Sequence, residues 1–319
     1  MTRSFAVADI GGTNARFARA TLRDDGSIEL DEPSLLATDD HPSLADAWRA
    51  FLARHPDFDP EGAALALAGP VGKGRFKLTN ADWAFDTTTV ADELGLSRAM
   101  LINDFEAVAH AIAGDPDADH IEHLAGPQRP LPESERVTVV GPGTGLGIAH
   151  YRVHEGRAYI QSTEGAHIDF APTCALDDAV LALLRQEHDR VSVERVISGD
   201  GIRWIDAALR GKPPAPDPLP IWQAGMAGND PETARAVDHF VATLGRVAGD
   251  YALSHGSAGV VIAGGLGLRL REELSHPGFH EAFMAKGRFR RMMEDIPVKL
   301  IGHDQPGLLG AARAFFARR

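Results

Sequence analysis

The order of apolar and polar positions predicts strands in both halves of the chain and helices mainly in the second half. Short runs rich in apolar and β-branched residues are typical of strands, and those that are apolar at nearly every position are typical of central, buried ones. In chain order these runs are 4–9, 15–22, 28–37, 62–71, 99–104, 136–141, 147–153, 158–163, 258–267 and 296–302. The pattern predicts a protein built from mixed sheets with helices packed on them.

Helical spacing is clearest at 231–255, where one stripe of apolar residues runs the length of the segment: Val237, Phe240, Val241, Leu244, Val247, Ala248 and Tyr251. Further helices are expected at 43–54, 105–114, 177–187 and 306–319. Ser43 precedes the first of these and can serve as its N-cap. The segment 114–135 is rich in Pro, Asp, His and Gly, which predicts a loop or linker.

Two glycine-rich turns follow strands of the same style. Near the N-terminus the sequence reads "FAVADIGGTNARFA", and at 136–147 it reads "RVTVVGPGTGLG". Each turn is followed by two further predicted strands, so the strand–turn–strand order occurs twice with little sequence identity. Such a repeat is what duplication of one supersecondary unit produces.

Composition narrows the class of protein without naming it. The chain has 319 residues, which favours two domains, and its 44% hydrophobic content is ordinary for a globular protein. The net charge of −13 argues against nucleic acid or an anionic membrane as partner. No apolar run approaches the ~20 residues of a membrane helix, and the first residues do not resemble a signal peptide. Cys174 is the single cysteine, which excludes an internal disulfide and favours a cytoplasmic location.

The glycine turns do not match the two common nucleotide fingerprints. After Gly143, the dinucleotide pattern fails at Ile148, and the mononucleotide loop has no matching segment. A glycine turn between strands can still bind phosphate, because its N–H groups form a concave nest that an anion approaches closely. Thr13 and Thr144 would add hydroxyl donors, and Asp9 is placed to hold a hydrated Mg²⁺. The alternative is a pair of tight hairpins whose glycines supply positive φ.

Seven motifs in this order resemble one family. "DIGGTN", "NDF", "GPGTGLG", "EGAHIDFAP", "ERVISG", "IAGGL" and "HDQPGLLGAA" are similar to motifs of bacterial ATP-dependent glucokinases without a zinc segment, in the hexokinase–actin superfamily. The resemblance covers nearly the whole chain. It implies an α/β, two-lobed actin-like ATPase (ribonuclease H-like) fold, with a small domain of 1–105 plus 304–319 and a large domain of 106–303.

The resemblance also implies which residues bind the nucleotide and perform the chemistry. ATP would contact Ala8, Asp9, Ile10, Gly11, Gly12, Thr13, Gly143, Thr144, Gly145, Gly264 and Gly265, with Mg²⁺ held through water by Asp9. The general base of the family maps onto Asp104, which follows a buried strand as ligand-binding residues of α/β sheets do. The alternative for Asp104 is an N-cap of the helix that begins at Phe105.

The sugar ligands implied by the resemblance are Asn103, Asp104, Glu164, His167 and Glu194, and Asn80 is a further candidate on a loop. Taken singly, Glu194 is more typical of a solvated surface carboxylate and His167 of a structural histidine, and Asn80 could equally be a plain turn residue. Ala166 stands where the family usually has a second glycine, so its methyl group is expected to crowd the loop that carries His167.

The function implied is transfer of a phosphoryl group from ATP to the 6-hydroxyl of glucose, in a cleft between the two lobes. Two alternatives remain at this point: a kinase for another hexose or amino sugar on the same fold, and a sugar-sensing regulator without turnover. The partners expected are glucose and ATP, with Mg²⁺ as cofactor, and homodimers are common in such families. The chain starts directly at its first strand and keeps Asp104, which disfavours the regulator.

Overall fold

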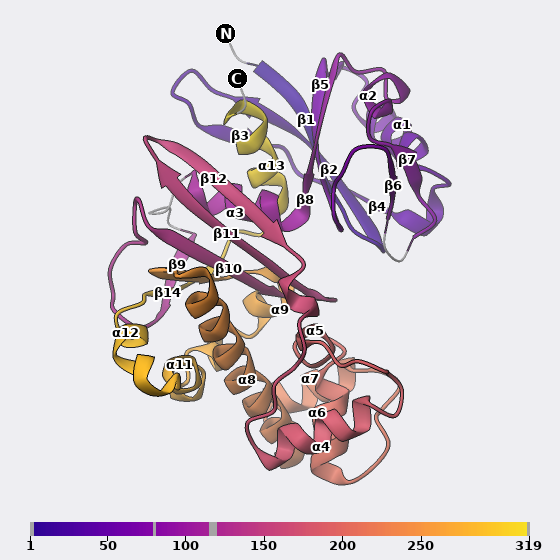
Figure 1. Cartoon of the computed structure of the whole chain (residues 1–319). Helices are drawn as coiled ribbons and strands as arrows, with labels where there is room; N and C mark the ends of the chain where they lie inside the picture. The colour runs from indigo at the N-terminus through magenta and orange to yellow at the C-terminus, as the bar shows by residue number, and fades with distance from the viewer. Residues whose placement is uncertain (1–2, 79–80, 115–119, 318–319) are drawn as a thin grey trace. The chain divides into compact units, whose positions relative to one another are not determined.

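The computed structural model describes residues 3–78, 81–114 and 120–317, and the chain divides into two compact units (Figure 1). The first unit contains Met1–Asp115, Glu155–Ser162 and His303–Arg319, and the second contains Pro116–His154 and Thr163–Gly302. The last helix therefore belongs with the N-terminal part of the chain. Among the described residues, no helix is both long and apolar enough to cross a membrane.

The sheet of the first unit is mixed, and its strand β5 is fully buried. The strand order is β3-β2-β1-β5-β8, with β4 also paired to β2. The bounds are β1 Arg3–Ile10, β2 Asn14–Leu22, β3 Ile28–Leu30, β4 Ser34–Ala37, β5 Gly62–Leu67 and β8 Arg98–Asn103. β1 runs antiparallel to β2 and parallel to β5, and β5 runs parallel to β8. Every residue of β5 is buried, as its continuous apolar sequence predicts.

Three main helices pack in this unit: α1 Leu44–Arg54, α3 Asp104–Ala113 and α13 Pro306–Ala317. A short pair, β6 Arg75–Lys77 and β7 Ala84–Asp86, and the helix α2 Val90–Glu93 complete it. The prediction for α1 is confirmed, including its cap, because the Ser43 side chain accepts a hydrogen bond from the Asp46 N–H. The single strand expected at 28–37 is wrong: it is two short strands, separated at a segment containing Pro33, which has no N–H to donate to a ladder.

Helices α3 and α13 approach very closely in the first unit. Gly310 lies against the Ala107 carbonyl oxygen, so that even a methyl group at position 310 would clash with that backbone. The other face of α13 packs on the sheet, where the Phe315 and Phe5 rings stack at 4.5 Å between centroids. Figure 1 shows α13, at the yellow end of the colour scale, beside the indigo strands of this sheet. The C-terminal helix is thus an integral part of the N-terminal unit.

The second unit repeats the strand order of the first. Its strands are β9 Ile121–Ala125, β10 Arg136–Pro142, β11 Leu146–His154, β13 Gly259–Ile262 and β14 Val298–Ile301, and β12 Arg157–Thr163 follows β11 in the chain. The order β11-β10-β13-β14 matches β2-β1-β5-β8, again with one antiparallel pair followed by parallel ones. The predicted internal repeat is confirmed at the level of topology. The loop expected at 114–135 is partly wrong, since β9 pairs antiparallel with β14 inside it.

Helices outnumber strands in the described part of the second unit. They are α4 Ala175–Leu184, α5 Val193–Val196, α6 Ile202–Arg210, α7 Leu219–Met226, α8 Pro231–His255, α9 Gly264–Arg269, α10 Arg271–Leu274, α11 Pro277–Met284 and α12 Arg290–Glu294. The long helix predicted at 231–255 is confirmed residue for residue as α8, with the predicted apolar stripe buried. Gly245 lets α11 approach α8, because its Cα faces the Phe279 carbonyl oxygen.

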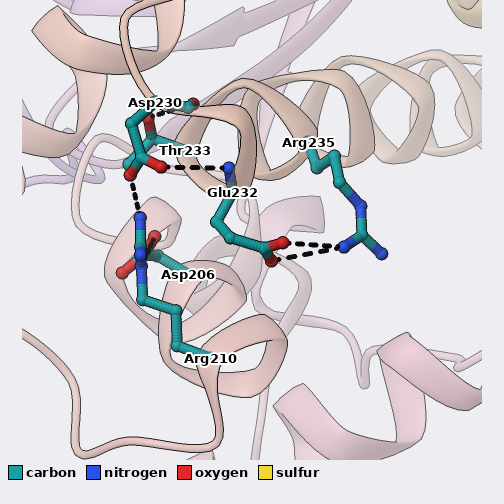
Figure 2. A network of polar contacts seen from close by, with 6 residues as sticks. All are labelled: Asp206, Arg210, Asp230, Glu232, Thr233 and Arg235. Atoms are coloured by element: carbon teal, nitrogen blue, oxygen red, sulfur yellow. Dashed lines mark hydrogen bonds and ion pairs between the residues drawn. The ribbon is translucent and has the colours of Figure 1, made fainter.

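A polar network fixes the start of α8 (Figure 2). The Asp230 side chain accepts from the Glu232 N–H at 3.3 Å as N-cap, and Pro231 occupies the first turn, where no N–H is needed. Arg210, at the end of α6, pairs with both Asp206 and Asp230. The network joins the ends of two helices that pack in the core of this unit.

Candidate active site

The first glycine turn joins β1 to β2 and is held by Thr38. The Gly11 N–H donates to the Asn14 carbonyl at 3.0 Å, which closes the turn. Thr38 is buried, and it donates from its hydroxyl to the Gly12 carbonyl at 2.7 Å and from its N–H to the Thr13 carbonyl at 3.0 Å. These two hydrogen bonds from Thr38 fix the conformation of the turn. The Thr13 side chain remains exposed.

The second glycine turn joins β10 to β11 in the corresponding place. The Gly143 N–H donates to the Gly145 carbonyl at 2.8 Å, and the Gly143 carbonyl accepts from the Gly199 N–H at 2.7 Å. The Trp222 indole N–H donates to the Gly199 carbonyl at 2.9 Å and extends the support into the helical core. Thr144, like Thr13, is exposed.

Positive φ does not explain the glycines of the two turns. Gly11, Gly12, Gly143 and Gly145 all lie in described segments, and none is among the glycines with positive φ. The alternative, that the turns are tight hairpins whose glycines supply positive φ, is therefore wrong about why the glycines are needed. What the missing side chain provides at Gly143 is open space beside the backbone, because an added Cβ there would have no neighbour within 4 Å.

A third glycine pair lies at the end of β13, beside the second turn. Gly264 does require its special conformation, with φ of 80°, and an added Cβ would lie 2.5 Å from the Pro142 carbonyl oxygen at the end of β10. Gly265 next to it is open. Ala8 and Ile10 are instead fully buried inside β1, so any contact they make with a ligand can only involve their main chain.

Asp9 stands at the end of β1, where its carboxylate faces Arg16 and the start of α13. The Arg16 Nη1 lies 4.0 Å from the Asp9 Oδ2, which is longer than a hydrogen bond. Burial raises the Asp9 pKa, and the Arg16 charge opposes that rise. Hard oxygen ligands suit Mg²⁺, and the partly buried Asp9 carboxylate, which Arg16 does not hydrogen-bond, is of the type that could hold such an ion.

Gly307, within the motif "HDQPGLLGAA", makes room for this carboxylate, a role that the motif itself does not show. An added Cβ at position 307 would lie 2.8 Å from the Asp9 Oδ2 and 2.9 Å from its Cγ. Thr38 and Gly307 are thus supporting residues that sequence reasoning missed. Each comes from a segment remote from the turn in sequence, so local patterns could not reveal its contact with the turn.

The N-cap of α3 is Asn103, and the N-cap alternative for Asp104 is wrong. The Asn103 Oδ1 accepts from the N–H groups of Phe105 at 2.9 Å and Glu106 at 3.1 Å. Its Nδ2 donates to the Gly69 carbonyl at 3.1 Å. Asp104 is the first residue of the helix, half-buried, and its Oδ1 accepts from the Phe105 N–H at 2.9 Å. The carboxylate is held at the positive end of the helix without being needed to cap it.

Three of the residues expected to bind sugar lie together in the second unit. The His167 Nε2 is 3.5 Å from the Glu164 Oε2, and the His167 Nδ1 is 3.9 Å from the Glu194 Oε1. Glu164 and His167 are exposed, whereas Glu194 is partly buried. We call Glu164, His167 and Glu194 the sugar group. An exposed imidazole between two carboxylates offers donors and acceptors in fixed places, which is what recognition of a polyhydroxyl ring requires.

The loop that carries Glu164 and His167 is anchored from α8. The Tyr251 hydroxyl donates to the Gly165 carbonyl at 2.8 Å, and burial raises the pKa of Tyr251. Ala166 does not crowd the loop, contrary to expectation, because its side chain is buried in the core of this unit. Its methyl group therefore adds to the packing under His167. Asn80 lies outside the described residues.

A separate group of metal-ligand types, Cys174, Asp177 and His239, was found in the described part of the chain. Its carboxylate is already occupied: Asp177 accepts from His239 at 2.9 Å and from Arg246 at 2.7 Å. These partners hold the pKa of Asp177 far below its usual value, against its burial. The Arg246 guanidinium supplies the positive charge that a metal ion would, so this group is a structural network around the buried Asp177.

The strand order of both units and the placement of a glycine turn in each define an actin-like ATPase fold of the sugar-kinase type. The glucokinase family model matches residues 6–318. A glucokinase from Zymomonas mobilis is 45% identical over 311 residues, which cover 96% of each chain. The chain belongs to the glucokinase family.

Solved structures agree on the fold. The crystal structure of a glucokinase from an Antarctic psychrotroph matches with a TM-score of 0.84 and 33% identity, covering 98% of each chain. A glucokinase from Streptomyces griseus, in complex with glucose and AMPPNP, matches with a TM-score of 0.59 and 19% identity over 98% of each chain. The latter likeness concerns the fold alone.

Proposed function

We propose that this protein transfers the γ-phosphoryl group of ATP to the 6-hydroxyl of glucose, giving glucose 6-phosphate and ADP. The observation that carries the proposal is the position of Asp104 in the first turn of α3, directly after β8 and next to Asn103, which caps the helix. Membership of the glucokinase family supports the substrate.

In this mechanism Asp104 is the general base. The glucose 6-oxygen attacks the γ-phosphorus, the bond from that phosphorus to the β,γ-bridging oxygen breaks, and the hydroxyl proton passes to the Asp104 carboxylate. A position at the positive end of α3 lowers the basicity of a carboxylate. A weak base suffices because, in a loose phosphoryl-transfer transition state, positioning and charge stabilisation provide most of the rate.

Glucose recognition is divided between Asn103 with Asp104 and the sugar group. Asn103 has used both lone pairs of its Oδ1 and one N–H, so it offers the sugar a single N–H. Glu164 and Glu194 accept from hydroxyl groups, and the imidazole of His167 can donate or accept. Asn80 is a further candidate for this set.

The two glycine turns and the Gly264–Gly265 pair bind the nucleotide. Main-chain N–H groups and the exposed hydroxyls of Thr13 and Thr144 face the phosphates. Asp9 holds Mg²⁺ through water, and the ion, when bound, neutralises charge on the phosphates. A cytoplasmic location, where ATP and reduced thiols are present, fits the single cysteine, and we propose a homodimer by analogy with related kinases.

The test is Asp104→Asn. The amide keeps the volume of the side chain, and the helix keeps its Asn103 cap, so folding should survive with a small loss from the helix-dipole interaction, about 0.3–1 kcal/mol. Turnover should fall by about 10²–10⁴ or more, since the amide cannot accept the proton. The measurements are kcat in a coupled assay of ADP release over a panel of hexoses, and the glucose Kd on the same preparation. A kcat within a few-fold of wild type would remove Asp104 as the base.

A further inference from the structure

The carboxylate of Glu194 faces two different parts of the second unit. Its Oε1 lies 3.9 Å from the His167 Nδ1, inside the sugar group. Its Oε2 accepts a hydrogen bond of 2.9 Å from the Leu146 N–H, directly after the second glycine turn. One side chain thus joins the proposed sugar ligands to the proposed phosphate-binding turn.

Gly145 leaves the space that this carboxylate fills. An added Cβ at position 145 would lie 2.5 Å from the Glu194 Oε2 and 3.2 Å from its Cδ, closer than a methyl group and a carboxylate oxygen can approach. The φ angle of Gly145 is not in the left-handed region, so its backbone would accept an alanine. Gly143, in the same turn, has nothing within 4 Å of an added Cβ. The two glycines therefore have different reasons to be glycine.

We propose that Gly145 is a positioning residue for sugar recognition. It allows the Glu194 carboxylate to lie against the turn, with Oε2 on the Leu146 N–H and Oε1 directed to the sugar group. The inference rests on the proposed role of Glu194 as a sugar ligand. It follows that a substitution within the nucleotide turn damages glucose binding even when no nucleotide is present.

The experiment compares Gly145→Ala with Gly143→Ala by calorimetric titration of glucose in the absence of nucleotide. Gly145→Ala should weaken glucose binding by about ten- to hundredfold, the worth of one hydrogen bond to a charged group. Gly143→Ala should change the glucose Kd by less than about twofold, because its methyl group meets open space. A Gly145→Ala variant that is folded and binds glucose as the wild type does would overturn the proposal.

A double-mutant cycle with Glu194→Ala tests the route of the effect. Removing the carboxylate removes the conflict, so Gly145→Ala should have little further effect on glucose binding in the Glu194→Ala background. If Gly145→Ala alone fails to fold, the double variant should fold with the melting temperature of Glu194→Ala. A double variant that is also unfolded, or that loses as much affinity again, would show that Glu194 does not set the space at position 145.

The same cycle separates this inference from the proposed function. If Glu194→Ala binds glucose normally, the assignment of Glu194 to the sugar group is wrong. If Glu194→Ala loses glucose affinity and Gly145→Ala does not, the assignment stands and the positioning role of Gly145 fails.

Discussion

The two glycine turns lie at the same place in sheets of the same strand order, but their carboxylates have different origins. In the first unit the carboxylate is that of Asp9, which is part of β1 and lies two residues before Gly11. In the second unit the corresponding position of β10 is Gly141, and the carboxylate at the turn is Glu194 of α5. A duplicated backbone thus keeps its shape while the charged group is supplied by the strand in one copy and by an added helix in the other.

The supports of the two turns differ in the same way. Thr38, which follows the strand β4, holds the first turn through carbonyl oxygens, and Gly307 makes room beside its carboxylate. The helical insertion of the second unit holds the second turn through Gly199 and Trp222. We infer that the first turn is specialised for the metal–nucleotide and the second for connecting nucleotide and sugar.

Among the substitutions that test this comparison of the two turns, Asp9→Asn is expected to have the largest effect. If the first turn serves the metal–nucleotide, loss of this charge should lower kcat/KM for Mg·ATP by about 10²–10³, the range for one preorganised electrostatic group. Glucose affinity measured without nucleotide should stay within twofold. If Asp9→Asn weakened glucose binding as much as nucleotide binding, the proposed difference between the two turns would be wrong. AMPPNP titrations with and without Mg²⁺ give a readout independent of turnover.

Glu164→Gln tests the second unit in the complementary direction. An exposed carboxylate that accepts from a sugar hydroxyl contributes on the order of 1.5–3 kcal/mol, so kcat/KM for glucose should fall roughly ten- to hundredfold. The affinity for AMPPNP should be nearly unchanged, because Glu164 contacts His167 rather than the turn. Normal glucose kinetics in this variant would move Glu164 out of the site.

Gly307→Ala should give a smaller, selective effect. Its methyl group would displace the Asp9 carboxylate, and we expect the KM for Mg·ATP to rise by several-fold, up to about tenfold, with glucose binding unaffected. Alanine is the better helix former by about 1 kcal/mol, so lost activity without lost stability separates positioning from folding. Gly278→Ala in α11, where an added Cβ meets nothing within 4 Å, is the matched control and should leave both constants unchanged. An unaltered KM in Gly307→Ala would show that Asp9 adapts freely.

The smallest expected effect is on the pH dependence of folding stability, and it arises from a histidine of the second unit. Burial, with the nearby His150 and Arg136, lowers the pKa of His255 to about 4, below its ordinary value of 6.5. A histidine whose pKa is lowered in the folded state binds its proton more tightly when unfolded. Its contribution is therefore complete above pH 6.5 and is lost as the pH falls from 6.5 towards 4.

The melting temperature should accordingly drop by a few degrees over that interval, as for a loss of roughly 1 kcal/mol. The His255→Asn variant should show a shallower drop, while its lost contact with Thr138, 2.9 Å in the wild type, lowers stability at all pH values. An equally steep pH dependence in the variant would assign the effect to other groups.

Local patterns predicted most of the fold, and long-range contacts explain what they missed. The stripe of α8 and the cap at Ser43 are encoded within a few turns of helix, and both are confirmed. β9 was missed because a short, partly exposed edge strand lacks a clear apolar pattern, and it is defined by its pairing with β14. The alternative that Asp104 caps α3 placed the cap one residue too late, since Asn and Asp are both good caps and adjacent in the sequence.

The candidate site shows the same limit. The motifs identified Glu164, His167 and Glu194, and the structure brings them together in the second unit. What no motif shows is that Glu194 also bonds Leu146, 48 positions away, or that Gly307 lies against Asp9. The sequence alone does not distinguish a glycine that supplies positive φ, such as Gly264, from one that leaves space, such as Gly145.

The close fit of α13 into the first unit has a consequence for biosynthesis. A chain emerges from the ribosome N-terminus first, and its domains generally fold as units in that order. Here the second unit has all of its segments once Gly302 has emerged, whereas the first still lacks α13, the helix that lies against Ala107 and stacks Phe315 on Phe5. The part of the protein that is translated first is therefore the last to be completed. Until then, the sheet of the first unit lacks α13, one of the helices that pack on its apolar face.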